Sequence, residues 1–100
     1  MRGEWHLNKI EKVIYTAMIK QCIYKLENDI VCEIDLTHTT LNPNQVGEVL
    51  EDLGYYQDYF ETNGWEQDCW ISFAKDGHPT LIIYSCGMTF DLILRKEDED

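Results

Sequence analysis

The central half of this sequence contains no lysine or arginine. Residues 26–74 include eleven aspartates and glutamates, and the whole chain has 8 basic against 19 acidic residues, a formal net charge of −11. Binding to DNA, RNA or anionic membranes needs a cationic surface, so we expect neither nucleic acid nor a membrane as direct partner. A field of one sign suits the electrostatic steering of a cationic protein, although an acidic surface can also serve solubility alone.

Export signals, long apolar runs and low-complexity segments are also missing. The N-terminus has no apolar core behind a basic start, and the most apolar stretch, residues 81–94, is interrupted by polar side chains. Six glycines and two prolines in 100 residues are too few for a linker or a fibrous chain. We therefore expect a single acidic domain over residues 1–100, with a frayed tail at 97–100 and a cytoplasmic location.

Known catalytic and metal-binding motifs are absent. The cysteines at 22, 32, 69 and 86 are at least ten residues apart, whereas zinc sites generally contain a close cysteine pair, so we expect four reduced thiols. Cys32 and His38 are the candidate pair of a nucleophile and its base, since a strand end and its loop are close in space. Four cysteines and three histidines, however, produce such pairs by chance. We expect no cofactor, no metal and no enzymatic activity.

The first predicted helix covers residues 9–26. Asn8 and Glu11 form a capping-box pattern at its start, and apolar residues at helical spacing predict one stripe that faces the core. An alternative places a strand at 19–26, because that part contains β-branched residues. The stripe consists of Ile10, Val13, Ile14, Ala17, Met18 and Leu26, broadened by Ile19, Cys22 and Ile23.

The second predicted helix covers residues 43–53. Asn42 is a candidate N-cap, Pro43 occupies the favoured first position, and Gly54 is a good C-terminal stop. Val46, Val49, Leu50 and Leu53 form its apolar stripe.

The remaining apolar runs alternate with polar residues, as strands do. Asn63-Gly64 is the strongest hairpin pattern and predicts a two-residue turn. The order α-β-α-β-β-β-β predicts an α+β fold, with two helices packed on a mostly antiparallel sheet of four to five strands, the last four forming a meander. The expected strands are Ile30–Leu36, Tyr55–Thr62, Trp65–Ala74, Thr80–Cys86 and Met88–Arg95.

Alternation along residues 65–74 assigns side chains to two faces. Ile71 and Phe73 mark the core face, so Glu66, Asp68 and Trp70 share the other. A tryptophan beside carboxylates is typical of a binding hot spot, unless the first helix covers this face and Trp70 belongs to the core. Carboxylates two residues apart on a strand lie about 7 Å from one another, a spacing that could imitate phosphates.

The strand before this one is rich in aromatic residues on both faces. Two helices cannot cover both faces, so we expect some of Tyr55, Tyr56, Tyr59 and Phe60 to be exposed. Together these patterns predict a partner-binding surface. It consists of Glu33, Asp35, Tyr56, Asp58, Glu66, Asp68 and Trp70.

No motif assigns the chain to a family. In size, acidity and aromatic content it resembles phage or mobile-element inhibitors that mimic nucleic acid. The resemblance implies a non-enzymatic module that blocks a basic protein, such as a nucleic-acid-binding protein or enzyme. A second interpretation is an accessory subunit that self-associates through sheet edges, for example as a homodimer, with acidity serving solubility. A third is a small metal binder or enzyme built on Glu33, Asp35 and His38.

The charge distribution predicts that the isolated protein does not bind duplex DNA. Phosphate contacts need lysine and arginine, and the centre of the chain has none. In a mobility-shift assay near physiological salt, we expect no retarded band. A band that survives competitor DNA would contradict this, and the five cations of residues 1–25 would then be responsible.

Overall fold

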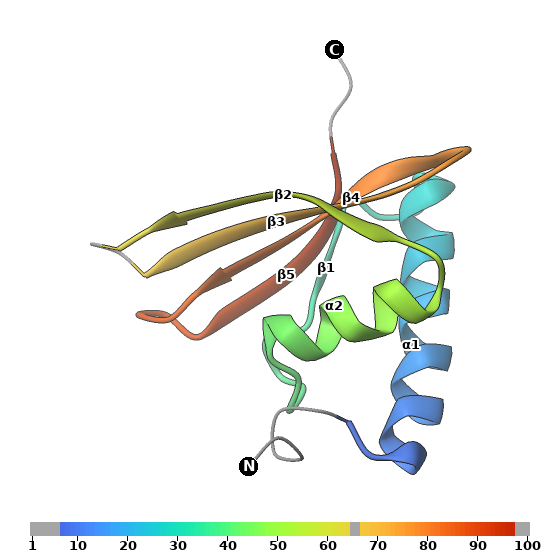
Figure 1. Ribbon diagram of the computed structural model, residues 1–100, viewed down its shortest axis with the longest axis horizontal. Coiled ribbons are helices and arrows are strands. Elements are labelled where there is room, and N and C mark those ends of the chain that lie inside the picture. The colour runs from blue at the N-terminus through green and yellow to red at the C-terminus, as the bar shows by residue number, and fades with distance from the viewer. Residues whose placement is uncertain (1–6, 65–66, 98–100) are drawn as a thin grey trace.

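The computed structural model describes residues 7–64 and 67–97. These residues form two helices and five strands in the order that the sequence predicts, so the α+β fold is confirmed (Figure 1). The helices are α1 (Lys9–Glu27) and α2 (Pro43–Asp52). The strands are β1 (Glu33–Asp35), β2 (Tyr56–Asn63), β3 (Asp68–Lys75), β4 (His78–Cys86) and β5 (Asp91–Lys96).

Helix α1 begins at a reciprocal cap. The backbone amide of Glu11 donates to the Asn8 side chain at 2.8 Å, and the Asn8 amide donates to the Glu11 carboxylate at 3.1 Å. Two of the amides that a helix leaves unpaired at its start are thereby satisfied. The helix continues without interruption to Glu27, so the alternative with a strand at 19–26 is wrong.

Helix α2 begins where the sequence predicts and ends at Asp52, one residue before the predicted end. The Gln45 amide donates to the Asn42 side chain at 2.9 Å, and Pro43 occupies the first turn, where its missing N–H leaves no partner unpaired. At the other end, Gly54 has a φ of 99°, a conformation that costs glycine little. This turn sends the chain directly into β2.

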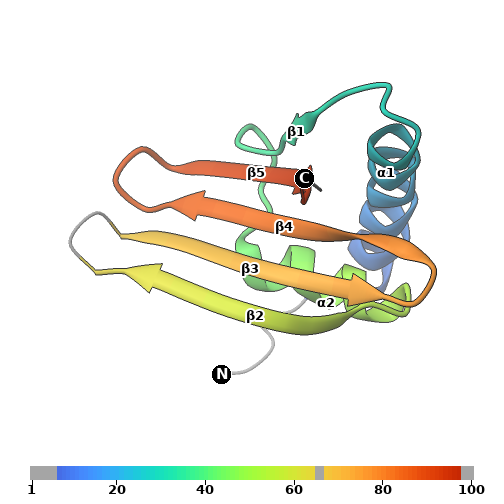
Figure 2. The same ribbon diagram turned by 90° about the horizontal axis from the view of Figure 1, so that it is seen from above.

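All five strands form one antiparallel sheet in the order β1-β5-β4-β3-β2. Strands β2 to β5 follow one another as a meander, as predicted, and the short β1 pairs with the outer side of β5. Both helices lie on one side of this sheet (Figure 1), and the view from above shows the strands uncovered (Figure 2).

The β2–β3 hairpin exists, but its turn is longer than predicted. Asn63 pairs directly with Asp68, so the connection spans residues 64–67 and the two-residue turn at Asn63-Gly64 is wrong. Gln67 has a φ of 58°, a left-handed conformation that sequence patterns seldom predict for glutamine. Strand β3 therefore starts at Asp68, and the expected start at Trp65 lies outside the described residues.

The β4–β5 connection is also longer than predicted. Cys86 pairs with Asp91, so residues 87–90 form a turn and the expected strand start at Met88 is wrong. Phe90 in this turn has a φ of 61°. Beyond β5, the amide of Glu97 donates to the Thr80 carbonyl at 2.8 Å, so Glu97 is not part of a frayed tail; residues 98–100 lie outside the described chain.

The core lies between the helices and the inner face of the sheet. Every second residue of β3, β4 and β5 points into it, beginning with Ile71, Leu81 and Leu92. Burying one such side chain stabilises the fold by about 1.5–3 kcal/mol. The helices contribute Ile19, Cys22, Leu26, Val46, Val49 and Leu50.

Of the apolar residues of α1 that were predicted to face the core, only those on one side of the helix and toward its C-terminus are buried. The C-terminal end of helix α1 packs against the sheet, and its N-terminal half extends away from the strands (Figure 1). This orientation leaves apolar side chains of the N-terminal half exposed. Neither described helix is long and apolar enough to cross a membrane. The buried residues of α1 are Ile19, Cys22 and Leu26; the exposed large apolar residues include Ile10, Val13 and Ile14.

Two substitutions in α1 test this orientation. Leu26→Ala should lower the free energy of unfolding by about 2–5 kcal/mol, because Leu26 is fully buried. Ile14→Ala should change it by no more than about 0.5 kcal/mol, because Ile14 is exposed. Urea unfolding followed by circular dichroism measures both. Equal losses would mean that the helix packs along its whole stripe.

Candidate functional site

One face of the sheet has no described helix over it. Because side chains alternate along a strand, the core positions Ile71, Ile83 and Leu94 fix the direction of their neighbours, which point away from the helices. We call this surface the open sheet face. Its principal residues are Glu33 and Asp35 of β1; Asp91, Ile93 and Arg95 of β5; Ile82, Tyr84 and Cys86 of β4; Asp68, Trp70 and Ser72 of β3; and Tyr56, Tyr59 and Glu61 of β2.

An aromatic pair occupies the middle of the open sheet face. Trp70 lies directly across from Tyr84 in the β3–β4 register, with ring centroids 5.3 Å apart and planes tilted by 47°. Such pairs contribute about 0.5–1.5 kcal/mol beyond the area they bury. Trp70 is half-buried by its neighbours on the sheet, and α1 lies on the opposite side. The alternative in which the first helix covers Trp70 is therefore wrong.

Asp68 lies on the same face but is buried, with 7% of its surface exposed. The Tyr84 hydroxyl donates to its carboxylate at 3.2 Å. Removal from solvent, and then the charge of Asp68 and this hydrogen bond, raise the pKa of Tyr84 to about 12. Asp68 therefore orients Tyr84, and it is less available for direct contact with a partner than its strand position suggested.

Two hollows flank Trp70. One, of about 400 Å³, lies between Tyr59, Ser72 and Ile82. The other, of about 270 Å³, is bordered by Tyr84, Ile93 and Arg95. Each has at least one carboxylate in its lining: Glu61 and Glu97 in the first, Glu33 in the second. Trp70 thus lines both hollows, and each combines aromatic and aliphatic side chains with at least one carboxylate.

Acidic side chains border the open sheet face at both edges. Glu33 and Asp35 are exposed on β1, and Glu61 is exposed on β2 across from Trp70. Hydrogen bonds from the side chain and backbone of Thr37 lower the pKa of Asp35 below its ordinary value, so it stays ionised at neutral pH. Among the principal residues, Arg95 is the one cation, and it lies opposite Glu33 in the β1–β5 register.

The predicted binding residues are distributed unevenly. Tyr56 is exposed on the open side of β2, and Asp58 is exposed where the β2–β3 register shifts at a bulge. Glu66 lies outside the described residues. Glu33, Asp35, Asp68 and Trp70 do share the open sheet face, from two strands, β1 and β3, that are distant in sequence.

Sequence reasoning missed Tyr84, Ile82 and Arg95. The alternation of β4, in which Leu81 and Ile83 face the core, would have placed Ile82 and Tyr84 together on the other side. That Tyr84 meets Trp70 depends on the β3–β4 register, which alternation alone does not supply.

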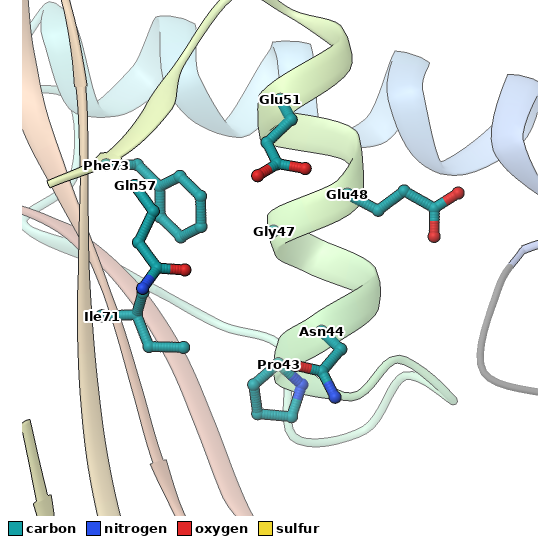
Figure 3. A pocket seen from close by; sticks show the side chains of 8 residues that line it. All are labelled: Pro43, Asn44, Gly47, Glu48, Glu51, Gln57, Ile71 and Phe73. Carbon is teal, nitrogen blue, oxygen red and sulfur yellow. The ribbon is translucent and has the colours of Figure 1, made fainter. Parts of the chain in front are cut away.

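A third hollow, of about 230 Å³, lies on the helix side between α2 and the strands β2 and β3 (Figure 3). Gly47 leaves room there for the ring of Phe73, because a Cβ atom at this position would lie 3.0 Å from Phe73 Cζ. The lining contains Glu48 and Glu51 but, among the described residues, neither histidine nor cysteine. It is a packing recess beside the core.

The Asp68–Tyr84 hydrogen bond can be tested by titration. Asp68→Asn should lower the pKa of Tyr84 toward its usual value of about 10, because it removes the charge while preserving partial burial. Since the folded-state pKa is raised, the associated stability is fully present below pH 10 and is lost as the pH rises through about 12. NMR of ¹³C-labelled tyrosine rings measures the shift, with Asp91→Asn as control. An unchanged Tyr84 pKa would mean that Asp68 does not hold the hydroxyl.

The described part of the chain contains no group of side chains that could hold a metal ion. Across residues 7–64 and 67–97, no three histidine, cysteine, aspartate or glutamate side chains could hold a metal ion together, so Glu33, Asp35 and His38 do not form the metal group considered above. The four cysteines are free thiols. Comparisons with protein families, with curated proteins and with solved structures find no match.

Proposed function

We propose that this chain is a non-enzymatic protein-binding module whose open sheet face receives a basic segment of another protein. The observation that carries the proposal is the Trp70–Tyr84 pair at the centre of a sheet face that no described helix covers. Tryptophan and tyrosine dominate interface hot spots, because they bury much area at little entropic cost.

The charges around the pair support a basic partner. Lysine or arginine side chains of a partner would meet Glu33, Asp35 and Glu61 at the rims, while a guanidinium group stacks on the exposed part of the Trp70 ring. Proteins that bind nucleic acid carry the densest exposed cations. We therefore propose that the module blocks a protein of this class by occupying its basic surface.

One version of this function, a strict imitation of phosphate spacing, receives less support. It relies on rows of exposed carboxylates, and in the β3 row Asp68 is buried against Tyr84. Glu33 and Asp35 remain as an exposed pair on β1. Steering by the acidic rim together with anchoring by Trp70 fits the open sheet face better than mimicry does.

Self-association through a sheet edge is the competing function. Strand β2 forms one edge of the sheet and is exposed from Tyr56 to Thr62. Its bulge at Asp58 and the carboxylates of Asp58 and Glu61 are features by which proteins discourage pairing between identical edges. The edge therefore favours a partner of different charge over a second copy.

Kinetic measurements with an arginine-rich peptide test the proposal. Trp70→Ala should raise the dissociation rate about 30-fold, corresponding to about 2 kcal/mol for a hot spot. Glu33→Lys with Asp35→Lys should mainly lower the association rate, and added salt should shrink this difference. Surface plasmon resonance at two salt concentrations gives both rates.

Met88→Ala is the matched control, because Met88 is an exposed apolar residue in the β4–β5 turn. All variants should melt cooperatively, since none of the changes touches the buried core. If Trp70→Ala binds the peptide as well as Met88→Ala does, the open sheet face is not the binding surface.

A further inference from the structure

Helix α1 has apolar residues on two opposite sides. One side, with Ile19 and Leu26, is buried in the core. On the other side Ile10 is 74% exposed, Val13 71% and Tyr24 59%. A helix that is apolar on both sides normally has a neighbour on each of them.

The exposed apolar residues of α1 lie on one side of the helix. At 100° per residue, Ile10, Val13, Ile14 and Ala17 form a patch there, and Tyr24 lies on the same side two turns further along, after the polar Gln21. These residues extend about 21 Å from Ile10 to Tyr24, at 1.5 Å per residue. Single exposed apolar residues are ordinary, whereas several exposed apolar side chains gathered on one side of a helix mark an interaction surface. We call this set the outer stripe of α1.

Lysines flank the outer stripe. Lys9 and Lys20 lie along one side of it and Lys25 along the other, and all three are exposed. Two glutamates also lie on these flanks, but Glu11 accepts a hydrogen bond from the Asn8 amide and Glu27 is bonded to His78. The sign of the lysines is opposite to that of the rest of the molecule, since residues 26–74 contain no lysine or arginine. We propose that the outer stripe of α1 docks an amphipathic helix of a partner protein, whose own apolar stripe is flanked by aspartate and glutamate. This surface is separate from the open sheet face and selects the opposite charge.

Two other occupants fit the charges less well. In an antiparallel pair of α1 helices from two copies, the flank with Lys9 and Lys20 would face the same flank of its partner, which places like charges together. An anionic membrane extends beyond the outer stripe and so also meets the acidic remainder of a chain whose formal charge is −11, whereas a helix that lies along the stripe meets mainly the charges within a Debye length of about 8 Å.

The test uses a fluorescein-labelled helical peptide of about 18 residues with leucines at helical spacing and glutamates on its flanks. A second peptide carries lysine in place of every glutamate. Fluorescence anisotropy should show binding of the acidic peptide and much weaker binding of the basic one. Ile10→Gln with Val13→Gln should weaken binding of the acidic peptide by at least about tenfold, and Lys9→Glu with Lys20→Glu should weaken it as well.

Phe90→Ser is the matched control, because Phe90 is 81% exposed but lies in the β4–β5 turn, outside the outer stripe. Its affinity should equal that of the unmodified protein, as should that of Trp70→Ala, which separates this surface from the open sheet face. The Ile10/Val13 variant should melt within about 4 °C of the unmodified protein, because both positions are exposed.

Each of four outcomes would overturn the proposal. They are the absence of acidic-peptide binding, equal affinity for both peptides, a dimer in light scattering that the Ile10/Val13 variant abolishes, and co-sedimentation with vesicles of phosphatidylserine and phosphatidylcholine that the same variant abolishes.

Discussion

The packing of two helices against one face of a five-stranded sheet is the constraint on which the other features depend. Helix α2 lies under the strands, whereas α1 contacts the sheet through its C-terminal end (Figure 1). This arrangement leaves the second face of the sheet without a cover among the described elements. An antiparallel sheet tolerates water on one side, provided that the exposed side chains pair among themselves. Trp70 on Tyr84, and the Tyr84 hydroxyl on Asp68, are pairs of this kind.

Local structure followed closely from the sequence. The caps at Asn8 and Asn42 and the stop at Gly54 are short-range interactions, so the residues concerned are neighbours in the chain. Turn lengths did not follow, because Gln67 and Phe90 adopt left-handed conformations for which the sequence pattern points to glycine or asparagine. These conformations are selected by the pairing of the adjoining strands, which depends on residues that are distant in the chain.

The same distinction explains how much of the candidate site was predictable. The face of the sheet on which Trp70 lies was predicted from its alternation with Ile71 and Phe73, a pattern between neighbours in the chain. The burial of Asp68 was not predictable, because it depends on the register that brings Tyr84 beside it. Apolar spacing in α1 predicted a helix correctly but could not show which side packs, since residues on both sides are apolar. Only the position of α1 relative to the sheet decides that question.

Charge that is segregated along the chain is also segregated in space. The open sheet face has acidic rims around an aromatic centre, and the outer stripe of α1 has lysines around an aliphatic one. A surface that serves solubility alone normally mixes both signs. Where charges of both signs do meet, they form ion pairs. Lys12 binds Glu48 and Asp52, each at 2.8 Å, and so links α1 to α2.

Lys9, Lys20 and Lys25 are instead exposed along the outer stripe, where their charge accompanies apolar side chains. Apolar contact supplies most of the affinity at an interface, and charge selects the partner. Each surface has both components, with opposite signs. Under the two proposals, a basic segment on the open sheet face and an acidic helix on the outer stripe of α1 would occupy separate surfaces, so the chain would bind two partners, or two parts of one partner, at the same time.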